Sequence, residues 1–223
     1  LRTPIAVLNL RLQRAHTSGK LDWDIIEREL AQVSRVIAQL LDLTRKEAHG
    51  HDEPLRIRPI VNLSRIIREA SASLIPLAEA RHRAIEVELP KKALVRGDED
   101  HLRDMFRNLI ENAIVHGQGT VSIRLESQER AVTRWIIDVV DEGEGVTPGY
   151  ETTVFERFRK LNPGSSGAGL GLAIVRQVVL NHRGRVAFLS GRGVVRVELS
   201  AIRDRDLDID IRDSISEPDL SEE

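Results

Sequence analysis

Apolar residues in the first 47 positions recur at alternating spacings of four and three residues, in two separate runs. The first run is Leu1, Ile5, Leu8, Leu12 and Ala15, and the second is Ile26, Leu30, Val33, Ile37 and Leu40. This spacing predicts two amphipathic helices, joined by a turn over residues 17–20 into an antiparallel hairpin. Because a lone hairpin leaves both apolar seams uncovered, we expect a homodimer through residues 1–47 that forms a four-helix bundle. The alternative is two helices that pack on the rest of the chain.

The pattern changes after a linker at residues 48–54, which show no periodicity. Alternation or apolar runs predict strands over residues 55–58, 85–89, 121–125, 135–140, 185–189 and 194–199. The run at 135–140 is expected to be buried. Helical periodicity covers residues 62–82 with a break near Pro76, residues 99–116 after an Asp98 cap, and the segment from about 170 to 182. Residues 55–200 therefore predict an α+β domain, an α/β sandwich in which a mixed sheet carries helices on one face.

Composition excludes several classes of protein. Apolar residues make up 41% and charged residues 30% of the chain, which is ordinary for a soluble globular protein. The absence of cysteine excludes disulfides, thiolate zinc sites and thiol catalysis. Aromatic residues are only 3%, which disfavours stacking on single-stranded nucleic acid. No apolar run is long enough to span a bilayer, so we expect no membrane contact by these residues.

Charge is distributed unevenly along the chain. Residues 201–223 carry nine acidic and three basic side chains, a net charge of −6. The remaining residues hold 30 basic and 26 acidic side chains, or +4, which is too weak for a nucleic-acid footprint. We therefore expect no nucleic-acid partner, and an acidic C-terminal tail over residues 201–223 that packs on this chain or a neighbouring one.

The sequence Asp141-Glu-Gly143-Glu-Gly145 directly follows a predicted strand. Glycines let a backbone approach a planar ligand closely and adopt positive φ. A carboxylate at the end of a strand accepts a hydrogen bond from an amino group such as that of adenine. The alternative is an ordinary turn with an acidic cap.

A second glycine-rich stretch, Gly167-Ala-Gly169-Leu-Gly171, opens the last predicted helix. Unpaired N–H groups at a helix N-terminus without obstructing side chains form an anion site. The same spacing occurs in dinucleotide-binding folds, but there it must follow the first strand of a βαβ unit. Here it follows a polar loop, so that interpretation fails.

Two asparagines, Asn108 and Asn112, are four residues apart and therefore lie on one face of the predicted long helix. Amide oxygens ligate hard cations, and amide groups reach phosphates. The alternative is that both are solvent-exposed surface residues. Asparagine is a poor helix former, however, so two of them in one helix call for a reason.

Together these motifs resemble the ATP-binding domain shared by DNA gyrase, the large heat-shock chaperones, the mismatch-repair ATPases and the histidine kinases. Residues 108–113 resemble the N box, residues 141–145 the first glycine box and residues 167–171 the second. The segment Val154-Phe-Glu-Arg157-Phe-Arg-Lys160 is similar to the phenylalanine box that only histidine kinases carry.

The chain also begins with Leu1-Arg2-Thr3-Pro4, which resembles the end of the phospho-acceptor motif of sensor histidine kinases. By this match the acceptor histidine lies two residues before Leu1, and none of the seven histidines given replaces it. We therefore expect a fragment that cannot autophosphorylate. His182 is expected to be structural.

The resemblance implies a role for each matched residue. Asp141 pairs with the amino group of adenine, and Asn112 holds Mg²⁺ against the triphosphate with Asn108 beside it. The remaining expected ATP-binding residues are the glycines of the two glycine boxes and two cationic side chains that contact the phosphates: Gly143, Gly145, Gly167, Gly169, Gly171, Arg157 and Lys160. Thr3 is expected to orient water when the regulator is dephosphorylated. Val115 departs from the family pattern, because a lysine or arginine usually stands there.

These implications predict the cytoplasmic catalytic core of a two-component sensor histidine kinase, part of a bacterial inner-membrane protein. ATP and Mg²⁺ are the expected cofactors, and a second copy of the chain and a response regulator are the expected partners. The alternative is a non-catalytic dimeric scaffold, or a phosphatase derived from such a kinase. A serine kinase of the anti-sigma type is disfavoured by the phenylalanine box and the hairpin.

Overall fold

The computed structural model describes residues 57–129, 132–159, 169–189 and 191–202 of the chain. The predicted hairpin over residues 1–47, the linker and the acidic tail beyond residue 202 lie outside these ranges, so they remain predictions. Among the described residues, no helix combines the length and the apolar character that crossing a bilayer requires.

A five-stranded mixed sheet, in the order β2-β4-β5-β7-β6, forms one layer of the domain. Its strands are β2 (Ile85–Glu88), β4 (Val121–Gln128), β5 (Arg134–Val140), β6 (Arg185–Leu189) and β7 (Val194–Ser200). β2 and β4 are parallel, and the other neighbouring pairs are antiparallel. A short ribbon of β1 (Ile60–Asn62) and β3 (Leu94–Arg96) is antiparallel and separate from this sheet.

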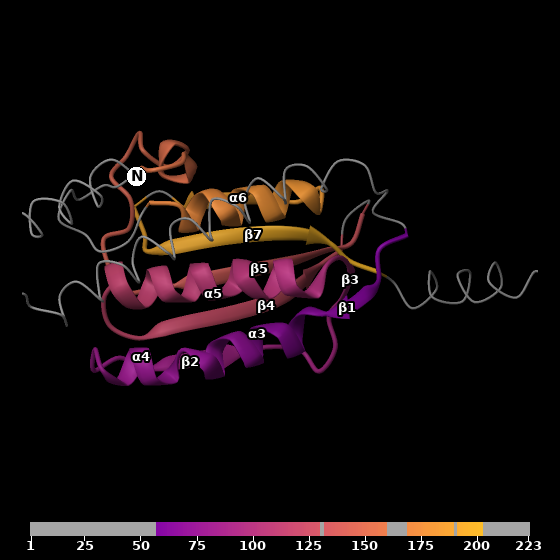
Figure 1. Cartoon of the computed structure of the whole chain (residues 1–223), viewed down its shortest axis with the longest axis horizontal. Coiled ribbons are helices and arrows are strands. Elements are labelled where there is room, and N and C mark those ends of the chain that lie inside the picture. Colours follow the sequence, from indigo (N-terminus) through magenta and orange to yellow (C-terminus); the bar gives the residue numbers. More distant parts are fainter. Residues whose placement is uncertain (1–56, 130–131, 160–168, 190, 203–223) are drawn as a thin grey trace, which may run out of the picture.

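The helices lie on one face of the sheet, as Figure 1 shows for α3, α5 and α6. They are α3 (Leu63–Ser73), α4 (Ile75–Glu79), α5 (Glu99–His116) and α6 (Gly171–Asn181), with a short 3-10 turn η2 (Thr153–Phe155). The α+β class, the mixed sheet and the one-sided helix layer predicted from the sequence are therefore confirmed.

Proline positions explain how the first helical segment is divided. Pro76 lies in the first turn of α4, where its missing N–H leaves no intrahelical bond unmade, so it separates α3 from α4 as predicted. The strand predicted over residues 55–58 is wrong in its described part, since β1 begins only after Pro59, at Ile60. β3, its partner, has only three residues, too few for an alternating pattern.

Strand β5 is buried on one face only, which corrects the expectation of a fully buried strand. Ile137 and Val139 face the core, whereas Asp138 on the opposite face accepts two hydrogen bonds from Arg196, at 2.8 and 2.7 Å. Because helices cover only one face of the sheet, the other face is left to charged cross-strand pairs.

The core is centred on one face of α5. Its members on this helix recur at spacings of three and four: Leu102, Met105, Phe106, Leu109, Ile110, Ala113 and Ile114. Each large side chain among them contributes about 1.5–3 kcal/mol by leaving water. The Asp98 side chain caps the helix as predicted, because it accepts the N–H of His101 at 2.9 Å. This burial fixes α5 against the sheet and its two neighbouring helices.

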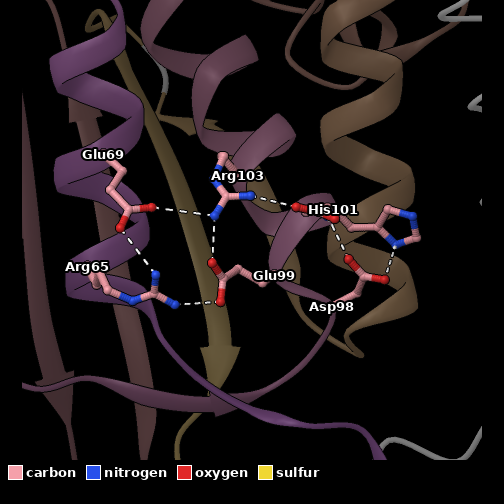
Figure 2. Close-up of polar contacts among 7 residues, drawn as sticks. Arg65, Glu69, Asp98, Glu99, His101 and Arg103 are labelled. Atoms are coloured by element: carbon pink, nitrogen blue, oxygen red, sulfur yellow. Dashed lines mark hydrogen bonds and ion pairs between the residues drawn. The ribbon is translucent and has the colours of Figure 1, made fainter.

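A cluster of ion pairs joins α3 to the first turn of α5 (Figure 2). Arg65 pairs with Glu69 at 3.2 Å and also with Glu99, while Arg103 reaches Glu69 at 3.4 Å and Glu99. The hydrogen bond from Arg65 lowers the pKa of Glu99. Because about a third to a half of each of these side chains is exposed to solvent, such pairs add little to stability.

His182, at the end of α6, links that helix to the beginning of α5. Its Nδ1 donates to the Val178 carbonyl at 2.7 Å, and its Nε2 accepts the Asp98 backbone N–H at 3.3 Å. Both contacts are satisfied only by the neutral ring. Burial lowers the pKa of His182 to about 4, and the nearby charge of Arg58 acts in the same direction. A Cβ on Gly97 would clash with the ring, so this histidine is packed as a structural residue.

Substitution of His182 by Gln is expected to flatten the pH dependence of the free energy of unfolding between pH 6.5 and 4. Within that window the unfolded chain binds more protons than the folded chain, because the folded pKa is about 4 and the unfolded value 6.5. The stability present above pH 6.5 is therefore lost as the pH falls, by about 3 kcal/mol in total. Urea unfolding at several pH values measures this slope.

The matched control is His82→Gln, which replaces an exposed histidine and should leave the slope as it is in the wild type. If His182→Gln retains the wild-type slope, the buried neutral histidine is not the group that titrates.

Candidate functional site

Three element ends meet at one end of the domain, on the left in Figure 1: the C-terminus of α5, the end of β5 and the beginning of α6. Asp141 directly follows β5, Gly117 directly follows α5, and Gly171 is the first residue of α6. Segments that carry three different sequence motifs are therefore brought together by the fold.

The carboxylate of Asp141 is held by backbone N–H groups from two loops. Its Oδ1 accepts the N–H of Gly143 at 2.7 Å and that of Gln118 at 3.3 Å. The backbone N–H of Asp141 donates to the Gly193 carbonyl at 2.7 Å. Within the described residues, both bonds to the carboxylate use Oδ1, which leaves Oδ2 for a ligand. The side chain is half-buried, so a ligand can reach it.

Three glycines give this carboxylate its space. A Cβ added at Gly143 would lie 2.7 Å from Oδ1, one at Gly193 would lie 2.6 Å from it, and one at Gly117 would clash with the carboxyl carbon. The motif analysis identified Gly143 but missed Gly117 and Gly193. Gly117 ends a helix and Gly193 lies in a hairpin turn, where glycine is common for other reasons. The sequence around Gly117 and Gly193 therefore gives no sign that either glycine makes room for the Asp141 side chain.

Gly145, the other glycine of the first box, has a different role in the structure. Its φ is +74°, and a Cβ there would clash with the Arg192 carbonyl. It therefore allows the loop after β5 to pass the turn between β6 and β7. Gly145 shapes the loop, whereas Gly143 contacts the carboxylate.

The N box lies against the second glycine box. A Cβ at Gly171 would lie 2.9 Å from Oδ1 of Asn108, whose Nδ2 donates to the Asp104 carbonyl at 2.8 Å. Asn112 is half-buried one turn further along α5. Within the described residues, Leu170 at the N-cap of α6 makes no side-chain hydrogen bond to the first turn of the helix. Amide oxygens and a helix N-terminus therefore lie side by side.

The phenylalanine box is anchored at both of its phenylalanines. Phe155 is buried and packs against Phe188, with ring centroids 5.5 Å apart. Phe158 is half exposed and has a φ of +62°, and its N–H donates to the Gly169 carbonyl at 2.8 Å. A non-glycine residue at positive φ is strained, typically by about 1–3 kcal/mol. This contact ties the end of the box to the second glycine box.

The structure says less about the other predicted site residues. Arg157 is exposed, between the two phenylalanines. Thr3, Lys160 and Gly167 lie outside the described residues, so their roles remain predictions.

The donor set fits an adenine nucleotide. A carboxylate with one oxygen left for a ligand suits an amino group, and the N-terminus of α6 suits phosphate. Amide oxygens of Asn108 and Asn112 are hard ligands of the kind that Mg²⁺ accepts.

Comparison with known proteins supports this chemistry. The family described as "Histidine kinase-, DNA gyrase B-, and HSP90-like ATPase" matches residues 97–201. The chain is 30% identical over 217 residues to the sensor protein SphS of Synechococcus elongatus, an alignment that covers 89% of this chain and 52% of SphS. The chain thus spans about half the length of this relative.

Two solved structures share the fold. The mycobacterial sensor histidine kinase MprB is 27% identical with a TM-score of 0.55, over 65% of this chain and 98% of that one. The Acinetobacter baumannii histidine kinase AdeS is 20% identical with a TM-score of 0.70, over 91% of this chain and 97% of that one. Residues 97–201 therefore resemble the ATPase domain that histidine kinases share with DNA gyrase B and HSP90, and these two similar structures are histidine kinases.

Substitution of Gly143 by Ala is expected to lower the free energy of unfolding by about 1–3 kcal/mol, the usual cost of overpacking. The added Cβ would lie 2.7 Å from Asp141 Oδ1, and its next neighbour, the Gln118 nitrogen, is an ordinary 3.5 Å away. In an Asp141→Ala background the same change should therefore cost less than about 0.5 kcal/mol.

Urea unfolding of the four proteins completes this double-mutant cycle. Equal costs in the two backgrounds would show that Gly143 does not make room for the carboxylate.

Proposed function

We propose that this chain is the catalytic core of a two-component sensor histidine kinase. It binds ATP with Mg²⁺ and supports transfer of the γ-phosphoryl group to a histidine and then to an aspartate of a response regulator. The observation that carries this proposal is the glycine-lined carboxylate of Asp141 at the same end of the domain as the contact between Asn108 and Gly171. The histidine kinase names of the similar solved structures support it.

Asp141 recognises the adenine base. Two backbone N–H groups hold Oδ1, so Oδ2 accepts the exocyclic amino group of the base. An ionised carboxylate accepts hydrogen bonds but cannot donate them. Binding of a base that carries a carbonyl in place of the exocyclic amino group is therefore disfavoured. Selection for adenine therefore depends on the orientation of this single carboxylate.

The phosphates lie at the beginning of α6. The Leu170 side chain does not cap this helix, and we expect the glycines at positions 167, 169 and 171 to let anionic oxygens approach its first N–H groups. Asn112 holds Mg²⁺ through its amide oxygen, with Asn108 beside it. When bound, the metal neutralises the charge that develops on the phosphates during transfer.

Positive charge near the phosphates comes from Arg157 and Lys160. This contribution matters because Val115, a half-buried apolar residue, stands where related kinases usually place a cation. Phosphoryl transfer relies on such charge, so these two side chains compensate for the missing one.

The remaining steps involve residues outside the described ranges. A homodimer through residues 1–47 presents the acceptor helix and docks the response regulator, and Thr3 orients water when the regulator is dephosphorylated. The acceptor histidine lies before Leu1, in a longer protein of which this chain is the cytoplasmic portion and whose other parts lie in the inner membrane.

A second candidate function is a dimeric scaffold or regulator phosphatase derived from such a kinase. The apolar Val115 at the usual cation position favours this alternative. A scaffold does not need nucleotide, so affinity for ATP separates the two functions.

Isothermal titration of this chain with ATP and Mg²⁺ is expected to give a Kd in the micromolar to millimolar range. Asp141→Asn should weaken binding by about 1.5–3 kcal/mol, the value of a hydrogen bond to a charged group, which is about ten-fold or more in Kd. The variant keeps an oxygen for the N–H of Gly143 but can present an amide donor to the amino group of the base. No binding by the wild-type chain would favour the scaffold, and unchanged binding by the variant would remove the base assignment.

The control in the same titration is Asn112→Ala, which removes the proposed metal ligand and leaves the base site intact. It should bind ATP with the same affinity with and without Mg²⁺, whereas Asp141→Asn should keep the metal dependence. If the affinity of Asn112→Ala still rises with Mg²⁺, this residue is not the metal ligand.

Incubation of this 223-residue chain with γ-labelled ATP and Mg²⁺ is expected to leave no acid-labile phosphate on the protein. None of its seven histidines lies in the acceptor motif, and transfer requires a nucleophile aligned with the γ-phosphate. A chain extended upstream with its native His-Glu should be labelled and should lose the label to its regulator. Labelling of the 223-residue chain would mean that the acceptor is misassigned, and a native gene without that histidine would favour the scaffold.

A further inference from the structure

Arg83 lies between α4 and β2 and binds the C-terminal end of α5. Its Nη1 donates to the Ala113 carbonyl at 2.8 Å, and its Nη2 donates to the Gly117 carbonyl. The Ala113 carbonyl also accepts the N–H of Gly117 at 3.0 Å, which closes the last turn of the helix. The guanidinium therefore spans the final turn of α5 and the residue that follows it.

The residues that Arg83 holds belong to the turn that supports Asp141. Gly117 lies directly against the carboxylate, and the N–H of Gln118 donates to its Oδ1 at 3.3 Å. The same turn pairs with Glu142, whose backbone N–H donates to the Gln118 carbonyl at 2.8 Å and whose Oε1 accepts the N–H of Thr120 at 2.9 Å. Movement of this turn would therefore move the carboxylate.

The chemistry of arginine suits this position. A planar guanidinium donates to two acceptors at once, which a lysine ammonium cannot do with the same geometry. A positive charge also interacts favourably with the carbonyl end of a helix. The backbone at Arg83 is itself held in place. The N–H of Arg83 donates to the Ala78 carbonyl at 3.0 Å, and the carbonyl of the adjacent Ala84 accepts the N–H of Val121 at 2.9 Å.

We propose that Arg83 is a positioning residue for base selection, an inference that rests on the proposed function. It fixes the turn after α5 so that Gln118 and Gly117 hold the Asp141 carboxylate in one orientation. Without the Arg83 side chain, the turn after α5 keeps its hydrogen bonds to residues 141–142 but loses those to the loop between α4 and β2. The carboxylate then samples other orientations, and the distinction between an amino group and a carbonyl on the base is reduced.

The test compares ATP with inosine triphosphate, which carries a carbonyl in place of the amino group of adenine. Calorimetric Kd values for both are measured for the wild type, Arg83→Ala, Arg83→Lys and the control Arg81→Ala. Arg81 is an exposed neighbour in the same loop, with no side-chain contact described. In Arg83→Ala we expect ATP affinity to fall about three- to ten-fold and inosine triphosphate affinity to change less than about two-fold, so that the ratio of the two falls. Arg83→Lys should be intermediate, and Arg81→Ala should match the wild type.

A purely structural role would weaken the binding of both nucleotides equally and leave the ratio of the two Kd values unchanged. That result in a folded Arg83→Ala or Arg83→Lys protein would overturn the proposal. Amide NMR spectra of the nucleotide-free proteins give a second readout. Arg83→Ala or Arg83→Lys should shift the Gly143 resonance, and Arg81→Ala should not; an unshifted Gly143 amide in both Arg83 variants would also overturn it. Absence of ATP binding by the wild type would instead count against the proposed function.

Discussion

The burial of α5 between the sheet and the neighbouring helices is the constraint on which the rest of the domain depends. A stripe of apolar side chains from Leu102 to Ile114 leaves water on one face of this helix. That burial sets the rotation of the helix, and the rotation directs Asn108 toward the beginning of α6. Because the ligand groups are carried by the same helix as the core, a change in core packing would also move the site.

Polar contacts fix the position of α5 along its axis, and they differ at its two ends. At the beginning, the Asp98 side chain caps the helix, and the His182 ring, which burial keeps neutral, accepts the Asp98 N–H. At the end of α5, the guanidinium of Arg83 donates to two backbone carbonyls. The two ends of the helix are thus held by different groups, a neutral imidazole at the beginning and a guanidinium at the end.

Glycines serve two separate purposes around the site. Gly145 and Gly169 adopt positive φ, which permits a turn that other residues would strain. Gly117, Gly143 and Gly193 have ordinary φ values and are needed for space, since each would place a Cβ against Asp141. A glycine-rich motif is therefore a mixture of backbone and packing requirements, and only the packing group is directly coupled to the carboxylate.

Sequence alone determined the fold class, the long strands, the boundaries of α5 with its Asp98 cap, and the identity of Asp141, Asn108 and Asn112 as candidate ligand groups. These features follow from local periodicity, from capping and from motifs that lie within short stretches of chain. Tertiary structure decided which glycines surround the carboxylate and that Arg83 braces the turn beside it. Contacts such as those of Gly193 and Arg83 join residues far apart in the chain, and neither residue type carries a local signal of its partner. Short β3 escaped prediction for the same reason, because its pairing with β1 rather than its own three residues makes it a strand.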